Sequence, residues 1–433
     1  MLYLQYNFKK RTKMIIEIHL SNFYSIKEDV VLDLKAGNSK TQKSQDLSHN
    51  VFDFEDTQLL KSVALYGANA SGKSNIIKAI QFCVRMILNS HNHNENVIFN
   101  FKPFKFQGFE KKPSTFKILF AIKEIEYEYS FSLNQTEIIT EELYYYPNGR
   151  RAKVFTRNEK LNNEKSKIYS FSSAIKKPLD VAENTSKKTL YISRASQMDR
   201  ELAKDIFRFF SESFFLGYIG FDNLAVEKLF DENKNQVLKA LQIADSDIID
   251  IKIKNELKPA KNLNADFVNN TASIKDEIQP HFIITSFHKS NPKVAFDFTA
   301  EESAGTKALF VFMLTILDVI KNNKMLLVDE IEMSLHTKIV EYIIELFNAS
   351  QSAQLIYSTH NTNLLNLDKL RKDQIYFVNK KEDGATDLYS LFDYKDFRDT
   401  MDVEKAYLQG RFDAIPYIND SFENLKSLLN ESK

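Results

Sequence analysis

The segment GANASGKS, residues 67–74, decides the fold of this chain. It fits the pattern Gly-x-x-x-x-Gly-Lys-Ser and lies between the apolar run SVALY at 62–66 and the helix-like stretch KSNIIKAIQFCVRMIL at 73–88. A strand, a glycine-rich turn and a helix in this order bind phosphate, because the glycines let backbone N–H groups and the helix N-terminus face an anion. A chance glycine-rich turn is the alternative, but the chain has only 10 glycines in 433 residues.

Each side chain of this segment has a physical role in such a loop. Lys73 would reach the β and γ phosphates of ATP, and Ser74 would hold Mg²⁺. The candidate nucleotide-binding residues here are Gly67, Ala68, Asn69, Ala70, Ser71, Gly72, Lys73, Ser74 and Asn75.

A second candidate is KMLLVDEIEMSLH at 324–336, an apolar run that ends in two carboxylates. Beside a phosphate-binding loop, Asp329 would join Ser74 in holding Mg²⁺, and Glu330 would orient or deprotonate the attacking water. An ordinary strand entering a loop has the same pattern. The phosphate-binding loop upstream favours the catalytic interpretation.

A third candidate is EESAGTKALFVFMLTILDVI at 301–320, where Ser303, Ala304 and Gly305 precede a long apolar helix. The unpaired N–H groups of a helix N-terminus and a nearby hydroxyl suit an anion. A plain N-cap at Ser303 or Thr306, without a ligand, is the alternative.

A fourth candidate is His360 in QLIYSTHNTNLL at 354–365, a polar turn after an apolar strand. Its imidazole could donate a hydrogen bond to a γ-phosphate. It could equally cap the turn. The gaps from Ser303 to Asp329 and from Glu330 to His360 each have room for about one helix and one strand.

The order of these four segments resembles that of the ABC-type ATPases, in particular their SMC and RecF-like branch. The resemblance implies an α/β P-loop NTPase fold, and the alternating runs at 115–122, 127–133 and 141–146 predict an antiparallel β lobe that flanks the nucleotide. It also implies a homodimer or higher homo-oligomer, in which Ser303–Gly305 of one copy cover the ATP bound by the other. It assigns the D-loop to Ser334 and Leu335 and the switch histidine to His360. An AAA+ fold would need no such Ser-x-Gly segment.

Other stretches resemble the bacterial AAA-family ATPases of abortive-infection and restriction-linked anti-phage systems. The sequence departs from those relatives at Tyr24, where they often carry Arg, and at Asp413, where they often carry Gly. Gln107 is the candidate for the Q-loop glutamine. The stretches that carry the resemblance begin at Met14 and continue at 101–107, 189–197 and 406–418.

These patterns predict a dimeric switch that ATP closes and hydrolysis reopens, and the resemblance implies a separate effector, a nuclease or a toxin. One alternative is a RecF-like repair ATPase that clamps DNA, so nucleic acid is a possible partner. Another is a scaffold that retains ATP with little turnover. With 58 basic and 58 acidic residues, the composition favours no nucleic-acid surface.

Length and composition predict a cytoplasmic protein that does not insert into a membrane. The longest apolar stretch, 308–317, is too short to cross a bilayer, and one cysteine suits a reducing compartment. Because no sustained heptad pattern is present, we expect the inserted lobe to be compact and helical rather than a coiled coil. The predicted parts are an extension at 1–13, a first ATPase half at 14–156, a loop and helical insertion at 157–247, and a second ATPase half at 248–433.

Overall fold

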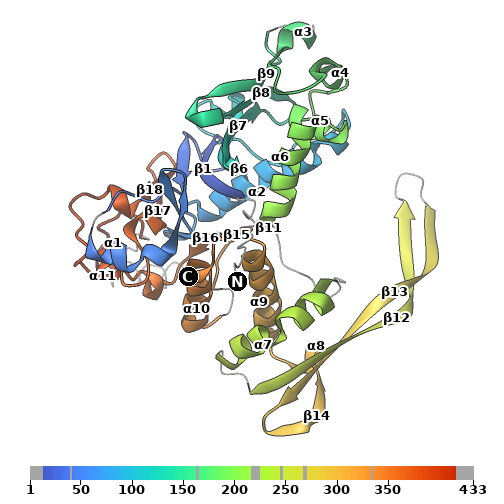
Figure 1. The fold of residues 1–433 in the computed structure, drawn as a ribbon, viewed down its shortest axis with the longest axis vertical. Helices are drawn as coiled ribbons and strands as arrows, with labels where there is room; N and C mark the ends of the chain where they lie inside the picture. The colour runs from blue at the N-terminus through green and yellow to red at the C-terminus, as the bar shows by residue number, and fades with distance from the viewer. Residues whose placement is uncertain are drawn as a thin grey trace, which may run out of the picture. The chain divides into compact units, whose positions relative to one another are not determined.

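A computed structural model describes residues 13–39, 41–161, 165–215, 225–243, 247–266, 271–332 and 335–415. Residues 1–12 of the predicted extension lie outside these ranges, and so does Ser334. The chain forms two compact units, each assembled from separate stretches (Figure 1). Unit 1 consists of Met1–Phe214, Leu327–Ile331 and Gln354–Lys433, and unit 2 of Phe215–Leu326 and Glu332–Ala353.

Unit 1 contains a seven-stranded antiparallel sheet. Aromatic side chains meet across it, because residues directly opposite one another on neighbouring strands share a face. Phe116, for example, pairs in register with Phe131, and their rings stack at 5.2 Å. The predicted flanking β lobe is confirmed. In spatial order the strands are β10 (Tyr169–Phe171), β9 (Ala152–Asn158), β8 (Ile138–Tyr145), β7 (Ile125–Leu133), β6 (Ser114–Ile122), β1 (Lys13–Ser21) and β2 (Val30–Asp33).

A second, six-stranded sheet carries the nucleotide motifs. Its strand β5 is buried at every position, which explains why SVALY is apolar except for Ser62. Strand β5 runs parallel to both β16 and β17, so the segments that follow these strands emerge at one edge of the sheet. The strand order is β11 (Phe214–Phe215), β15 (Met325–Val328), β16 (Gln354–Thr359), β5 (Ser62–Tyr66), β17 (Ile375–Lys380) and β18 (Thr386–Ser390).

The helix α2 (Lys73–Asn89) follows β5 and presents an apolar face to the core. Cys83 on this face is 1% exposed, and burial raises the pKa of its thiol well above the usual range. Between β2 and β5 lie the helix α1 (Gln42–Asp46) and the hairpin of β3 (Val51–Phe54) and β4 (Thr57–Leu60).

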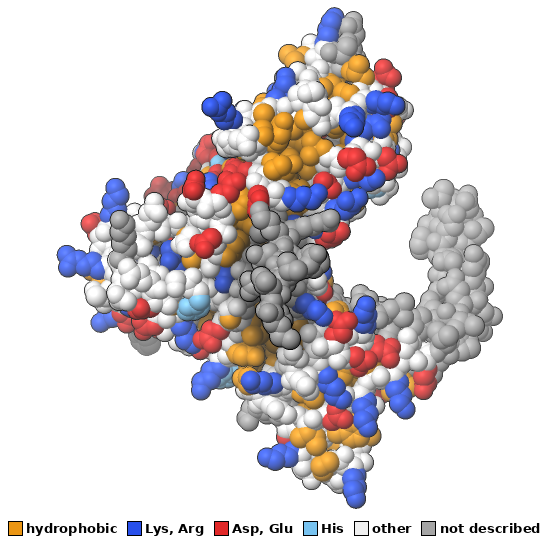
Figure 2. All heavy atoms as spheres, in the orientation of Figure 1, with side chains coloured by type: hydrophobic (Ala, Val, Ile, Leu, Met, Phe, Trp, Pro, Cys, Tyr) orange, Lys and Arg blue, Asp and Glu red, His pale blue; other side chains and the backbone are white. Residues whose placement is uncertain are grey.

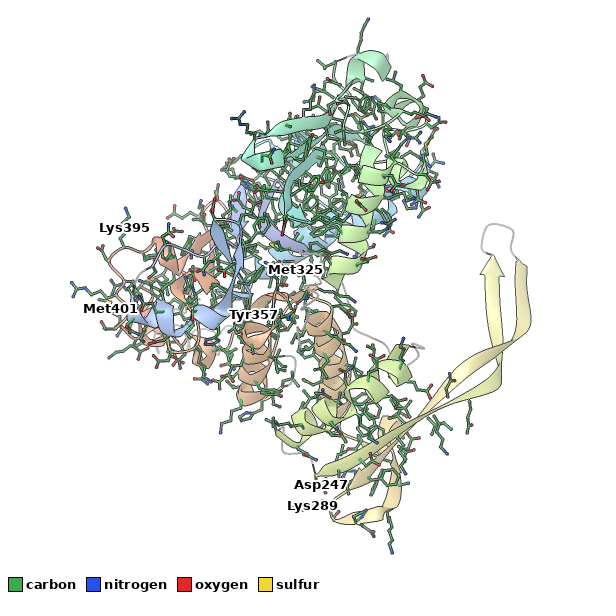
Figure 3. The ribbon with its side chains drawn as sticks, in the orientation of Figure 1. Asp247, Lys289, Met325, Tyr357, Lys395 and Met401 are labelled. Atoms are coloured by element: carbon green, nitrogen blue, oxygen red, sulfur yellow. The ribbon has the colours of Figure 1, made fainter. Side chains whose placement is uncertain are left out.

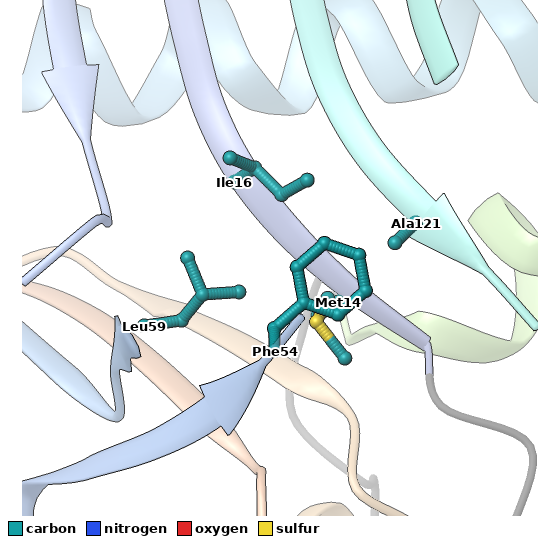
Figure 4. Close-up of a cluster of buried hydrophobic side chains, with 5 residues drawn as sticks. All are labelled: Met14, Ile16, Phe54, Leu59 and Ala121. Atoms are coloured by element: carbon teal, nitrogen blue, oxygen red, sulfur yellow. The ribbon is translucent and has the colours of Figure 1, made fainter. Parts of the chain in front are cut away.

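A small apolar cluster joins this hairpin to the large sheet. Figure 4 shows the Phe54 ring and the Leu59 side chain among residues of β1 and β6. Burying one such side chain stabilises a fold by about 1.5–3 kcal/mol, so the cluster is sufficient to hold a two-stranded hairpin that would be marginal alone. Its members are Met14, Ile16, Phe54, Leu59 and Ala121.

A buried carboxylate fixes the start of a helix in unit 1. Both oxygens of Glu141 accept backbone N–H groups at the N-terminus of α5 (Tyr191–Gln197), from Tyr191 at 2.6 Å and Ile192 at 3.0 Å. The Arg157 guanidinium lies 3.5 Å away, and both side chains are fully buried. The other helices of this region are α3 (Lys165–Ile168), α4 (Pro178–Glu183) and α6 (Glu201–Ser213). Helix α11 (Val403–Leu408) lies near the end of the described chain.

The described residues of unit 2 form four helices and a three-stranded antiparallel sheet, whose strands lie in the order β12, β13, β14. The long β12–β13 hairpin runs from the Ile248–His288 pair to the Asp266–Thr271 pair. Figure 3 shows Asp247 and Lys289 close together at its base, where the Lys289 N–H donates to the Asp247 carbonyl over 2.9 Å. The elements are α7 (Ala225–Ile243), β12 (Ile248–Asp266), β13 (Thr271–His288), β14 (Asn291–Asp297), α8 (Phe298–Glu301), α9 (Ala304–Lys321) and α10 (Thr337–Ala349).

The charged side chains of both signs are intermixed on the face drawn in Figure 2, as expected for a chain with a net charge of zero. Within the described ranges, no helix combines the length and apolar character needed to span a membrane.

Candidate nucleotide-binding site

The loop between β5 and α2 has the backbone geometry that its glycines predict. Gly72 has a φ of +118°, and a Cβ there would lie 2.0 Å from the Thr386 Oγ1. A Cβ on Gly67 would lie 2.2 Å from the Val378 carbonyl oxygen. Both positions therefore require glycine because of close approach, and Gly72 also because of its backbone conformation.

The Lys73 ammonium lies over this loop. Its Nζ donates to the carbonyl oxygens of Gly67 at 2.8 Å and Ala68 at 3.0 Å, and the residue is only 5% exposed. Beside it, the Ser71 hydroxyl is buried and has no hydrogen-bond partner among the described residues. A buried cation, an unsatisfied hydroxyl and the N-terminus of a 17-residue helix together fit a phosphate group.

Side chains from β18 and from the turn after β1 hold the loop in place. The Thr386 hydroxyl donates to the Ser71 carbonyl over 2.9 Å and lies 2.7 Å from the Ser25 hydroxyl. The Asn75 side-chain amide, a candidate nucleotide ligand, donates to the Ser25 Oγ over 2.7 Å. Sequence reasoning missed Ser25 and Thr386, because a hydroxyl in a turn or strand carries no motif of its own.

The turn after β15 is held by a residue of the neighbouring strand. The Ser358 hydroxyl on β16 donates to Asp329 Oδ1 over 2.6 Å and accepts the backbone N–H of Glu330 over 2.8 Å. Glu330 has a φ of +53°, a conformation that costs a non-glycine residue about 1–3 kcal/mol. Ser358 was not predicted, although it lies two residues before His360 in the segment that sequence reasoning singled out.

One cavity of about 690 Å³ brings the start of the phosphate-binding loop together with two predicted catalytic residues. The His360 Nε2 lies 4.0 Å from Glu330 Oε1, and the Glu330 side chain is 61% exposed. Part of the lining comes from 406–418, a stretch that carried a family resemblance but no assigned role. The lining residues are Gly67, Ala68, Asn69, Glu330, His360, Thr362, Tyr407, Leu408 and Ile415.

The segment Ser303–Gly305 belongs to unit 2, at the N-terminus of α9. The Ser303 Oγ accepts the Thr306 N–H over 3.0 Å, so this hydroxyl acts as an N-cap. Gln107 accepts a hydrogen bond from Lys27 and does not line the cavity. Leu335, the described residue of the predicted D-loop, bonds through its N–H to the Glu332 carbonyl.

Comparison with known families gives one match over most of the chain. The model of a family described as "AAA domain, putative AbiEii toxin, Type IV TA system" matches residues 62–366. The chain belongs to this family. The match begins at β5 and ends just after His360, so all four segments of this AAA-family chain lie within it. The predicted relationship to AAA-type ATPases of abortive-infection systems is confirmed, as is the α/β fold class.

The chain is also similar to a solved structure titled "Crystal structure of the SmcHead bound to the C-winged helix domain of ScpA". The alignment has a TM-score of 0.38 and 17% identity, and it covers 91% of this chain and 99% of the other. Comparison with curated proteins gave no match.

Proposed function

We propose that the chain binds and hydrolyses ATP in the cavity between the phosphate-binding loop and Glu330. The observation that supports this most strongly is that one cavity contains Gly67–Asn69, Glu330 and His360. These residues are the parts that phosphoryl transfer needs: a cradle for phosphates, a carboxylate for water and a donor for the transferred group.

The proposed roles follow from chemistry and position. The backbone of 67–75 and the Lys73 ammonium bind the phosphates, and Ser74 and Asp329 would hold Mg²⁺. When bound, that ion would neutralise phosphate charge. Glu330, whose side chain is largely exposed, orients or deprotonates the attacking water. His360 donates a hydrogen bond to the γ-phosphate.

A second copy of the chain completes the site in this proposal. The N-terminus of the 18-residue helix α9 carries the partial positive charge of the helix dipole, which suits an anion. The Ser303 hydroxyl accepts the N-cap bond and also lies 2.8 Å from the Thr306 Oγ1. It is compatible with this role when it accepts from Thr306 as well, because its own proton can then be donated. We therefore propose a head-to-tail homodimer, in which Ser303, Ala304 and Gly305 of each copy cover the ATP bound by the other.

The chain belongs to a family whose description names a putative AbiEii toxin, and this membership supports a role in phage defence. We propose that the ATP-driven opening and closing of the dimer controls a separate effector protein, a nuclease or a toxin, in the cytoplasm.

The substitution Glu330→Gln tests the catalytic part of the proposal. It removes the base but keeps the shape, so ATP binding should persist while turnover falls by about 100-fold or more. Nucleotide affinity, phosphate release and the mass of the assembly by light scattering are the measurements. An ATPase rate equal to that of the parent would show that Glu330 is not the group acting on water. A parent protein that does not bind ATP would overturn the whole proposal.

A further inference from the structure

A second hollow in unit 1 is separate from the nucleotide cavity. It has a volume of about 500 Å³ and lies along one face of α2, and its lining shares no residue with that of the nucleotide cavity. The lining residues are Phe23, Tyr24, Lys78, Gln81, Phe82, Arg85, Met86, Asn89, His93, Val97, Ile98, Phe99 and Asn100. We call this hollow the α2 groove.

The floor of the α2 groove is apolar and aromatic. Phe23, Met86 and Phe99 are 2%, 4% and 3% exposed, and the Phe23 and Phe82 rings lie 5.6 Å apart. At the rim, Ile98 is 69% exposed. A concave, mostly apolar lining with a few polar groups is typical of a binding site.

The charges that line the groove are of one sign. Lys78 and Arg85 are seven positions apart on α2, so they lie on one side of the helix about 10 Å apart along its axis. Within the described part of the chain, neither side chain makes a hydrogen bond or an ion pair. The lining contains no Asp or Glu. In a chain with a net charge of zero, this is a local excess of positive charge.

We propose that the α2 groove binds an acidic, apolar peptide segment of a partner protein. An amphipathic helix can place apolar anchors on the floor at i, i+3 and i+7 while its carboxylates reach Lys78 and Arg85. Two cations are few for a nucleic-acid site, which normally follows the phosphate backbone with many. Met86, Val97 and Ile98 match aliphatic side chains better than they match the stacked faces of bases.

The groove and the phosphate-binding loop share one support. Tyr24 at the rim is followed by Ser25, whose hydroxyl accepts from Asn75 and contacts Thr386. A peptide that contacts Tyr24 therefore lies one residue from the hydrogen bonds that hold the nucleotide loop. The proposed binding itself requires no ATP turnover, so it can be tested independently of the ATPase.

The test begins with the full-length protein and a random library of displayed peptides of about 16 residues, long enough to span the groove as a helix. We expect enriched sequences to combine Asp or Glu with Leu, Ile or Phe at helical spacing. The binding of a labelled enriched peptide, measured by fluorescence anisotropy, should weaken at least about tenfold in the double variant Lys78→Glu, Arg85→Glu, and several-fold in Ile98→Ser.

The matched control is Lys239→Glu with Lys338→Glu, which makes the same charge change at exposed helix positions of unit 2. It should leave peptide binding unchanged. Circular dichroism verifies the fold of every variant. Enriched peptides without acidic residues, or binding that survives Lys78→Glu, Arg85→Glu, would overturn the proposal. A third outcome would also overturn it: single-stranded DNA displaces the enriched peptide, and the binding of that DNA depends on Lys78 and Arg85. The groove would then be a nucleic-acid site.

Discussion

The Ser358 hydroxyl donates a 2.6 Å hydrogen bond to the carboxylate of Asp329. The same hydroxyl accepts the N–H of Glu330, the next residue, so one side chain of β16 contacts both the Asp329 carboxylate and the Glu330 backbone.

Removing this hydroxyl should impair turnover more than nucleotide binding. We expect Ser358→Ala to lower the ATPase rate by about 10- to 100-fold, as is usual for partners that orient metal ligands. The half-saturating Mg²⁺ concentration should rise as well, since Asp329 loses its orienting bond. Ser358→Thr, which keeps a hydroxyl, should restore much of the rate. Ser211→Ala on α6 is the control, because it removes a hydroxyl at an exposed site. An unchanged Mg²⁺ requirement in Ser358→Ala would contradict a positioning role.

The proposed sharing of each ATP site between two copies predicts complementation. Lys73→Ala should lose ATP binding, and Ser303→Arg should bind ATP without turnover. When the two variants are mixed, half of the dimers should have one intact site, which restores about a quarter of the parent activity. Steady-state phosphate release measures this recovery.

The control for complementation is a mixture of Lys73→Ala with Glu330→Gln. In the proposal, Lys73 and Glu330 of one copy act on the same ATP. Each of the two sites in a mixed dimer therefore carries one defect, and no recovery should occur. Equal recovery in the two mixtures, or none in either, would refute the assignment of Ser303 to the partner's nucleotide.

The hydrogen bonds of His19, a residue of β1, predict that the free energy of unfolding depends on pH in the neutral to alkaline range. Burial lowers the pKa of His19, but its hydrogen bonds with Asp29 and Glu17 outweigh that effect and raise the pKa to about 9. A folded-state pKa above the ordinary value means that protonated His19 stabilises the fold below pH 6.5, and that this stabilisation is lost as the pH rises toward 9. Denaturant unfolding of the parent and of His19→Gln should therefore give a stability difference that shrinks from pH 6.5 to above pH 9. A constant difference would show that the imidazole charge has no role.

The candidate site residues that could be predicted from sequence are those whose role follows from their place in a short local segment. The glycines at 67 and 72 were predictable because a phosphate-binding loop needs close backbone approach, and the structure places a Cβ clash at both. Glu330 and His360 were predictable because each follows a buried strand, and the carboxyl ends of strands gather at a sheet edge. Their presence in one cavity agrees with that reasoning.

The residues that sequence reasoning missed depend on contacts between distant segments. Ser25, Ser358 and Thr386 act through hydrogen bonds to residues far from them in the sequence, and a serine or threonine has no spacing pattern that reveals such a partner. The length of the β12–β13 hairpin was also missed. Its middle, such as NELKPAKNLN at 255–264, is rich in Lys and Asn and contains Pro259, so it lacks the alternation by which strands are recognised.

The single cysteine has a practical consequence. Cys83 is enclosed in the core, and a thiol that stays protonated reacts slowly with maleimides. Because the chain has no other cysteine, a thiol introduced at an exposed position would be the only fast-reacting one. One fluorophore per chain could therefore report the approach and separation of two copies in solution without first removing a native residue.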